Sequence, residues 1–194
     1  MRFAGTACGA AILVLVANIP AQAQDSPDKG GEDAFAAHRW SAEFALQAAL
    51  EAWNYNANHT ELYGVQEGVA YGLRHGLVLT ANQRIYYVSQ RGNDTWVLGL
   101  TSGLRGRLYR KSRASAFWQF EAGVSDAAIA VKPRGTRFNY LALGRIGALV
   151  RLNARLYLNN SIDVIHVSNA SLKGRGRNPD IEAIGLTTGL IVGL

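Results

Sequence analysis

Apolar residues occupy every second position through most of the chain beyond residue 40. In SAEFALQAALEA, residues 41–52, each even position is Ala, Phe or Leu, whereas the odd positions include Ser41, Glu43, Gln47 and Glu51. Ala, Leu, Glu and Gln are good helix formers, so composition alone favours a helix here. The period of two instead indicates a strand, because successive side chains of a strand point to opposite faces of a sheet.

The same alternation returns in seven further segments, and it predicts a chain built from eight strands. The predicted strands cover residues 41–52, 61–73, 77–89, 96–109, 116–125, 137–151, 155–168 and 181–194. They are longer than the roughly five or six residues typical of soluble sheets. Their length matches what a tilted strand needs to cross a bilayer. One residue breaks the pattern, since Glu67 falls among the apolar positions of its segment.

The alternation by itself fits two architectures. A soluble sandwich buries its apolar face, whereas a membrane barrel turns that face to lipid and keeps a polar, hydrogen-bonded interior. Strand length, the even number of strands and aromatic residues near strand ends favour the barrel. The aromatic residues concerned are Trp53, Tyr63, Trp96, Tyr109 and Tyr157. We therefore expect an all-β fold, an eight-stranded antiparallel transmembrane β-barrel that crosses the outer membrane with every strand.

The connections between the predicted strands alternate in length. With a periplasmic amino terminus, the longer connections are extracellular, which is the asymmetry expected of such barrels. The predicted extracellular connections are 53–60, 90–95, 126–136 and 169–180, and the periplasmic turns are 74–76, 110–115 and 152–154.

The first residues carry an export signal. The stretch MRFAGTACGAAILVLVANIPAQAQ has an early arginine, a short apolar run and a small-residue cleavage site, which predicts a signal peptide over residues 1–23. We expect residues 24–40 to form a periplasmic lead-in and residues 41–194 to form the barrel. The only cysteine, Cys8, lies in the signal, so the mature chain has no thiol, disulfide or cysteine-based metal site.

The formal net charge of +6 permits an anionic partner. An exported chain rarely meets nucleic acid, so we expect none, and outer-membrane lipid and anionic surface glycolipid are the better candidates. Lys132, Arg134, Lys173, Arg175 and Arg177 lie in the two longest extracellular connections. Their side chains can either bind lipid phosphates or form a solvated basic rim. The sequence also leaves open whether the protein forms a homodimer.

Three residues near the end of the chain could carry out ester hydrolysis. His166 and Ser168 are two apart on one predicted strand, so they share its lipid-facing side near the extracellular end. Glu182 opens the last strand on the same side, and antiparallel pairing brings it alongside His166 or Ser168. Asp163 has the opposite parity, and we expect it to face the interior as the partner of an arginine.

These residue types suit nucleophilic catalysis. A serine hydroxyl becomes a good nucleophile when an imidazole takes its proton, and a carboxylate orients that imidazole. Backbone N–H groups around Asn169 and Ala170 could stabilise the oxyanion. Polar residues at a barrel rim also occur without catalysis, where they meet lipid headgroups, and spacing alone does not separate these interpretations. No metal-binding or phosphate-loop motif is present, so we expect neither a metal nor a cofactor.

The run from His166 to Ala170, followed by Asn178, Pro179 and Glu182, resembles the PagL family of outer-membrane lipid A 3-O-deacylases. Members of that family are eight-stranded barrels with a His-Ser-Glu triad on the outer wall. They remove the ester-linked acyl chain at the 3 position of lipid A. The close similarity covers the end of the chain, and further upstream only the architecture agrees.

The resemblance implies roles for four residues. Ser168 would be the nucleophile, His166 the base, Glu182 the orienting acid and Asn169 a contributor to the oxyanion hole. The substrate would be lipid A in lipopolysaccharide, and no cofactor would be needed.

The chain departs from the family pattern in the loop after the nucleophile. The segment KGRGRNPD is a residue or two longer than usual, and Ser171 and Asp180 stand where glycine is expected. Two other functions therefore stay open: a non-catalytic structural or adhesion barrel, and an esterase that acts on another membrane lipid.

Overall fold

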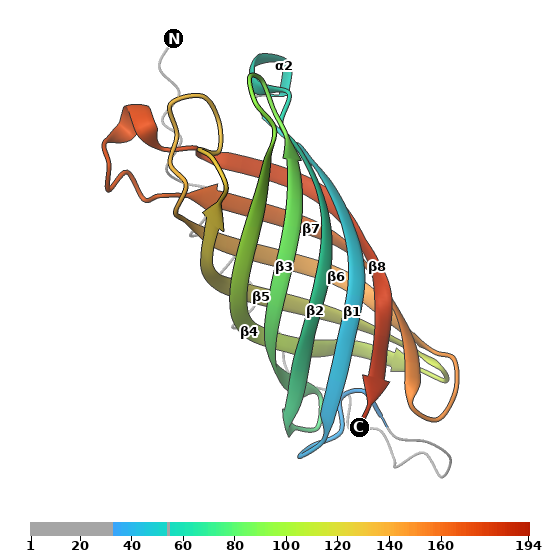
Figure 1. Ribbon diagram of the computed structural model, residues 1–194. Helices are drawn as coiled ribbons and strands as arrows, with labels where there is room; N and C mark the ends of the chain where they lie inside the picture. Colours follow the sequence, from blue (N-terminus) through green and yellow to red (C-terminus); the bar gives the residue numbers. More distant parts are fainter. Residues whose placement is uncertain (1–32, 54) are drawn as a thin grey trace.

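The computed structural model describes residues 33–53 and 55–194. They form a closed barrel in which each strand pairs antiparallel with its chain neighbours and β8 returns to β1 (Figure 1). The strands are β1 (Trp40–Glu51), β2 (Glu61–Arg74), β3 (Leu77–Ser89), β4 (Thr95–Lys111), β5 (Ala114–Ala127), β6 (Asn139–Arg151), β7 (Leu156–Ser168) and β8 (Ile181–Gly193). Two short helices lie in connections: α2 (Tyr55–Asn58) and the 3-10 helix η1 (Arg175–Arg177). The predicted all-β, eight-stranded barrel is confirmed, and the predicted signal peptide, residues 1–23, lies outside the described residues.

One predicted connection is mostly strand. Residues 110–115 were expected to form a turn, yet β4 continues to Lys111, which pairs with Ala114 at the start of β5. The turn itself is tight, with Ser112 in the left-handed region at φ 51°. Charged residues at this position resemble a loop in sequence, but backbone pairing continues past the lipid-facing belt because water accepts polar side chains on both faces.

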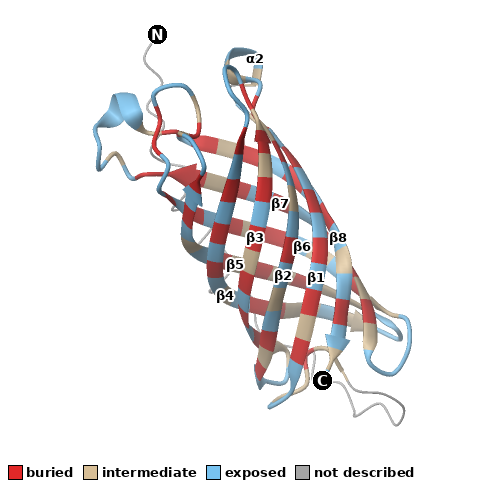
Figure 2. Ribbon diagram, viewed as in Figure 1, coloured by how far each residue is buried: buried red, intermediate tan, exposed pale blue. Residues whose placement is uncertain are grey.

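Apolar side chains cover the outside of the barrel. Along β1, Phe44, Leu46 and Leu50 are exposed, whereas Glu43 and Gln47 are buried. Buried and exposed residues alternate in the same way along the other strands (Figure 2). A polar interior with an apolar exterior is the arrangement of a barrel whose outer wall contacts lipid. Among the described residues, no helix is both long and apolar enough to span a bilayer.

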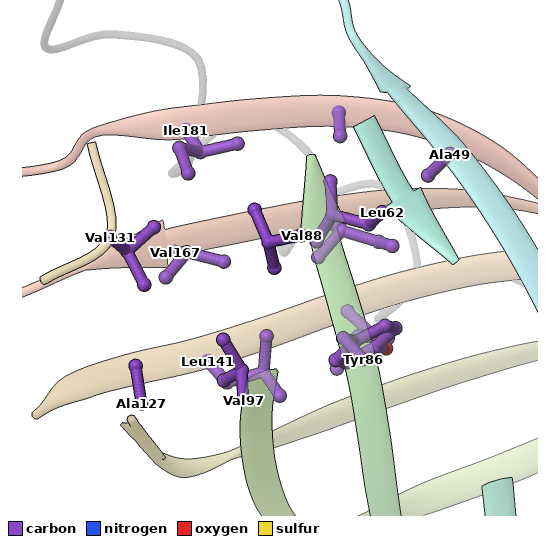
Figure 3. Packing of buried hydrophobic residues seen from close by; sticks show 13 residues of the cluster. Ala49, Leu62, Tyr86, Val88, Val97, Ala127, Val131, Leu141, Val167 and Ile181 are labelled. Atoms are coloured by element: carbon purple, nitrogen blue, oxygen red, sulfur yellow. The ribbon is translucent and has the colours of Figure 1, made fainter. Parts of the chain in front are cut away.

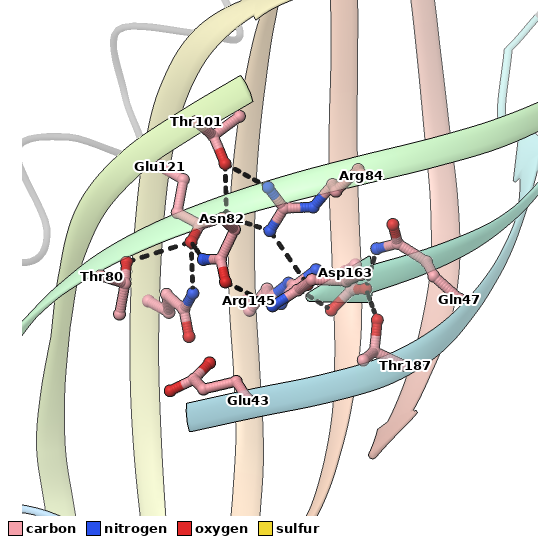
Figure 4. A network of polar contacts seen from close by, with 12 residues as sticks. Glu43, Gln47, Thr80, Asn82, Arg84, Thr101, Glu121, Arg145, Asp163 and Thr187 are labelled. Atoms are coloured by element: carbon pink, nitrogen blue, oxygen red, sulfur yellow. Dashed lines mark hydrogen bonds and ion pairs between the residues drawn. The ribbon is translucent and has the colours of Figure 1, made fainter. Parts of the chain in front are cut away.

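Ion pairs and hydrogen bonds fill the middle of the interior (Figure 4). The guanidinium of Arg105 donates to both carboxylate oxygens of Glu43, at 2.6 and 2.7 Å. Arg84 pairs with Glu121, and all four of these side chains are buried. Buried charges are tolerated when they are paired and hydrogen-bonded, so this network replaces the apolar core of a soluble domain.

Asp163 faces this interior, as predicted. Its Oδ1 lies 3.3 Å from Nε of Arg145 and accepts a hydrogen bond of 2.7 Å from Ser161. Gln47 and Thr187 donate to its other oxygen. The expected arginine partner is therefore Arg145, and Asp163 takes no part in the outer wall.

Apolar clusters close the interior above and below the polar network. At the extracellular end, one cluster includes Val88, Val131, Val167 and Ile181 (Figure 3). Val167 and Ile181 alternate with the candidate site residues along β7 and β8, so this packing fixes the two strands that carry the site. At the other end, Phe35 of the lead-in is buried in a second cluster.

The described part of the lead-in packs under the periplasmic end of the barrel. The guanidinium of Arg107 lies 4.7 Å from the centre of the Phe35 ring. Asp33 forms ion pairs with Arg107 and with Arg110, the latter at 3.3 Å. These contacts anchor the segment before β1 to the periplasmic end of β4.

Candidate functional site

His166 and Glu182 face each other on the outer wall. The register of β7 and β8 pairs His166 with Glu182, one of the two pairings that the sequence left open. On the same wall, Val164 is 44% exposed and Ile184 is 49% exposed. Side chains directly opposite each other on antiparallel strands have Cβ atoms about 4.5–5.5 Å apart, which is close enough for a carboxylate to orient an imidazole.

The start of β8 is fixed from both sides. The carbonyl of Glu182 accepts a hydrogen bond of 2.7 Å from the N–H of Ala52, just after β1. On the other side, β7 supplies the pairing described above. The position of the Glu182 backbone therefore depends on the barrel and not on the long connection before it.

Ser168 is the last residue of β7, two residues beyond His166 and opposite Tyr140 of β6. Its side of the strand is the outer one, yet it is only 8% exposed because residues 169–180 fold over it. The Ser168 hydroxyl donates to Oδ1 of Asn178 at 3.0 Å and accepts from the N–H of Ala170, also at 3.0 Å. Within the described part of the chain, no hydrogen bond joins the Ser168, His166 and Glu182 side chains to one another.

Asn169 donates three hydrogen bonds and is 4% exposed. Its side-chain amide donates to Oγ1 of Thr136 at 3.0 Å and to the carbonyl of Arg177 at 2.8 Å. Its backbone N–H donates to Oδ1 of Asn178 at 2.8 Å. Both predicted oxyanion donors are therefore occupied here, since the N–H of Asn169 bonds Asn178 and that of Ala170 bonds Ser168.

Two residues of this arrangement make contacts that sequence reasoning did not predict. Asn178 joins the hydroxyl of Ser168 to the N–H of Asn169, and Thr136 supports Asn169 from the connection between β5 and β6. Asn178 had a signal, because it belongs to the Asn-Pro pair that formed part of the family resemblance. Thr136 had none, because 33 residues separate it from Asn169 in sequence.

The loop turns sharply after β7. Ala170 and Ser171 have φ values of 52° and 59°, and Asp180 has 46°, all in the left-handed region. Ser171 and Asp180 are the positions where the sequence lacks an expected glycine. A non-glycine residue in this conformation costs roughly 1–2 kcal/mol. The loop reaches its closed shape despite this strain because Asn178 and Asn169 bond across it.

Lys173, Arg175 and Arg177 lie on the exposed surface of this loop. None of them forms an ion pair within the part of the chain that the structure describes. Lys132 differs, because its Nζ lies 2.7 Å from Oε1 of the buried Glu51. In the connection after β7 these cations are therefore exposed, whereas Lys132 of the connection before β6 stabilises the extracellular end of the barrel through its ion pair with Glu51.

No group of three or more possible metal ligands occurs among the described residues. The site consists of an imidazole opposite a carboxylate, with a serine two residues further along β7.

A closed, eight-stranded barrel with an apolar outer wall and a filled polar interior belongs to the outer-membrane β-barrels. This fold places the protein in the outer membrane.

Solved structures support this class. Neisserial surface protein A is similar with a TM-score of 0.57 and 10% identity, over 79% of this chain and 95% of that one. The outer membrane enzyme PagL is similar with a TM-score of 0.55 and 17% identity, over 77% of this chain and 97% of that one. OprG from Pseudomonas aeruginosa has a TM-score of 0.56 and 11% identity, over 82% and 97% of the two chains.

At these identities the similarities establish the fold, which an enzyme shares with a surface protein. No protein-family model matches the chain, and no curated protein matches its sequence at a significant level. Function therefore has to be argued from the site.

Proposed function

We propose that the protein is an outer-membrane serine esterase that removes the 3-O-linked acyl chain of lipid A. The observation that carries this proposal is the register of β7 and β8, which sets Glu182 opposite His166 on the lipid-facing wall. Ser168 follows His166 on the same side of β7. A base, an orienting carboxylate and a nucleophile are thus neighbours at the extracellular edge of the barrel.

The reaction follows from the properties of these groups. His166 takes the proton of the Ser168 hydroxyl as its oxygen attacks the ester carbonyl, and Glu182 stabilises the imidazolium that forms. The ester C–O bond then breaks, and the proton on His166 passes to the departing sugar oxygen. Water, activated by the same imidazole, cleaves the acyl-serine and releases the fatty acid. Two residues along a strand span about 6.6 Å, so the hydroxyl must turn from Asn178 toward His166 before it reacts.

Asn178 determines how an oxyanion could be stabilised. Its Oδ1 accepts from both the Ser168 hydroxyl and the Asn169 N–H, at 3.0 and 2.8 Å. A carbonyl oxygen of the substrate needs the Asn169 N–H, because the N–H groups after a nucleophile stabilise developing negative charge. In this mechanism the substrate carbonyl displaces the Asn178 oxygen, and the resting loop represents the state before substrate binds.

The location suits a substrate that stays in the membrane. Lipid A occupies the outer leaflet, and a site on the outer wall can accept its ester sideways without extracting it. The exposed cations of the adjacent loop, Lys173, Arg175 and Arg177, can pair with the phosphates of lipid A. The sequence resemblance around His166 and Ser168, together with the shared fold of the enzyme PagL, supports the same substrate.

A non-catalytic structural or adhesion barrel is the second candidate, and one observation favours it. The Ser168 hydroxyl is nearly buried and donates to Asn178, whereas a working triad requires it to donate to His166. A third candidate, an esterase acting on another membrane lipid, uses the same residues and differs only in its product.

Mass spectrometry of lipid A from cells that produce the protein separates these functions. We expect the wild type to remove one hydroxyacyl chain, and Ser168→Ala and His166→Ala to remove none. Glu182→Gln should retain slow activity, since loss of the orienting carboxylate lowers kcat by about 10⁴ in a serine protease triad. Ser102→Ala is the matched control, because Ser102 is exposed on the wall of β4, away from the site.

The alternatives give different results in the same experiment. Intact lipid A together with free fatty acid from phospholipid would identify the third candidate. Intact lipids in cells that contain abundant folded wild-type barrel would favour the non-catalytic one. Unchanged acyl loss in Ser168→Ala would reject the assigned nucleophile.

A further inference from the structure

A polar pair lies on the lipid-facing wall, away from the candidate site. Glu67 of β2 is directly opposite Gln83 of β3, and the Gln83 amide donates to Oε1 of Glu67 at 3.3 Å. Glu67 is exposed and Gln83 is half-buried. Glu67 is the residue that broke the apolar pattern of its segment, and the structure leaves it on the outer wall, without an interior partner.

The pair lies at the level of the hydrocarbon. Glu67 and Gln83 are near the middle of strands of 14 and 13 residues. Along the same row of the barrel, their neighbours are Phe44 of β1 and Leu100 of β4, both exposed apolar residues. Lipid tails therefore surround the pair in an isolated barrel.

The hydrogen bond between them satisfies only part of their capacity. A glutamine amide has two N–H donors and a carbonyl, and a glutamate has two oxygens. Hydrocarbon supplies neither donors nor acceptors, so polar groups exposed to it are costly, rare and functional in most membrane proteins. An occupant that offers both a donor and an acceptor at this depth would remove that cost.

We propose that this wall of β2 and β3 binds a second copy of the chain. A two-fold axis along the membrane normal, passing between β2 and β3, sets Glu67 against Gln83 of the partner subunit and Gln83 against the partner subunit's Glu67. The contact is self-complementary because the two residues are directly opposite each other on neighbouring strands. Glu67 then accepts from two amides, and each amide uses both donors.

The surrounding side chains suit a close approach. On one side of the pair lie Val65 and Ile85, and on the other lie Val69 and Ala81, all exposed. Small residues let membrane-embedded walls come close enough for polar side chains to bond across the interface. Ala81 provides that space next to Gln83.

A second lipid-facing polar pair does not suit such a contact. Asn160 of β7 is opposite Thr188 of β8, but both line a hollow of about 630 Å³. Ile146, Ile162 and Leu186 line the same hollow, are 67%, 61% and 65% exposed, and project from the wall as a ridge. Another barrel would meet this ridge before it reached the amide, so Asn160 serves as the matched control.

The proposed dimer leaves the candidate site accessible. Strand order places β8 and β1 between β7 and β2, so the site on β7 and β8 and the interface on β2 and β3 lie on different sides of the barrel. The dimer is independent of the esterase proposal, and either can fail alone.

Association of the purified barrel in phosphatidylcholine vesicles tests the proposal. Lys111→Cys, at the exposed end of β4, accepts donor or acceptor dyes, and energy transfer is measured as the protein is diluted with lipid. Glu67→Leu should raise the dimer dissociation constant about sevenfold, since polar contacts in membranes average about 0.6 kcal/mol and the interface loses two of them. Glu67→Gln keeps a donor and an acceptor and should stay within about threefold of the parent.

Asn160→Leu removes a lipid-facing amide elsewhere and should leave association unchanged. A leucine on the lipid face is favourable to a barrel, and migration of unheated samples on gels checks that each variant is folded. Should Glu67→Leu fail to fold, Gln83→Leu removes the same contacts. A parent protein that is monomeric at every dilution, or an equal effect of Glu67→Leu and Asn160→Leu, would overturn the proposal.

Discussion

Replacing Asn178 with alanine should open the loop over the candidate nucleophile. The Asn178 Oδ1 is the acceptor for two nearly buried donors, the Ser168 hydroxyl at 3.0 Å and the Asn169 N–H at 2.8 Å. Hydrogen bonds of this kind each contribute about 0.5–1.5 kcal/mol. Their loss should therefore destabilise the closed loop by about 1–3 kcal/mol, which raises the open population roughly 5- to 150-fold.

Amide hydrogen exchange of the folded barrel in micelles measures this opening. The N–H of Leu172 is a suitable reporter, because it donates to the carbonyl of Asn169 at 3.1 Å inside the loop. In Asn178→Ala the exchange of the Leu172 N–H should accelerate roughly 5- to 150-fold, while amides in the middle of β7 and β8 keep their protection. Asn178→Asp retains an acceptor oxygen and should stay close to the wild type.

Arg175→Ala is the control within the same loop, since its side chain is exposed and makes no ion pair with the described residues. Wild-type exchange of Leu172 in Asn178→Ala would refute the reasoning. So would equal acceleration by Arg175→Ala, because the loop would then be sensitive to any substitution.

Two further predictions concern the ion pair of Asp163 in the barrel interior and the pH dependence of the Asp94 contacts outside the membrane. Asp163→Ala leaves Arg145 buried without its counter-charge and should destabilise the barrel by about 3–5 kcal/mol in urea unfolding from vesicles, whereas adding Arg145→Leu should restore most of the loss; additive effects would contradict the ion pair. The pKa of Asp94, outside the membrane, is lowered from 3.8 by the Tyr87 hydroxyl and the Gln90 N–H. The stabilisation of the loop by the ionised Asp94 carboxylate is therefore complete above pH 3.8, and it is lost as the pH falls through the lower pKa of the folded state. The Gln90 amide should lose its protection from exchange only in that lower pH range.

Most of the fold could be predicted from the sequence because each strand has one face toward lipid and the other toward a polar interior. Lipid outside and a polar interior require a period of two, and that period places Asp163 opposite an arginine and Glu43 and Gln47 inside. The rule weakens beyond the lipid belt, where the strand near Lys111 looked like a turn. The pattern also did not explain Glu67, because a single exception to the alternation does not identify the residue that contacts it.

The candidate site was predictable only in part. Parity put His166 and Ser168 on the outer wall, but the length of the connection 169–180 admitted pairing of Glu182 with either residue. The contacts of Asn178 and Thr136 depend on how loops fold against one another, and no local pattern encodes them. The direction of the Ser168 hydroxyl is set by those same loop contacts.

The most direct test of the account uses purified protein. Vesicles containing lipid A are incubated with the folded wild-type barrel or with Ser168→Ala, and lipid A and released acids are measured by mass spectrometry. We expect the wild type to release one 3-hydroxy acid per lipid A, leaving a free hydroxyl at the 3 position, and the variant to release none. Lipid A that stays intact with folded wild type, or equal release by both proteins, would contradict the proposed site.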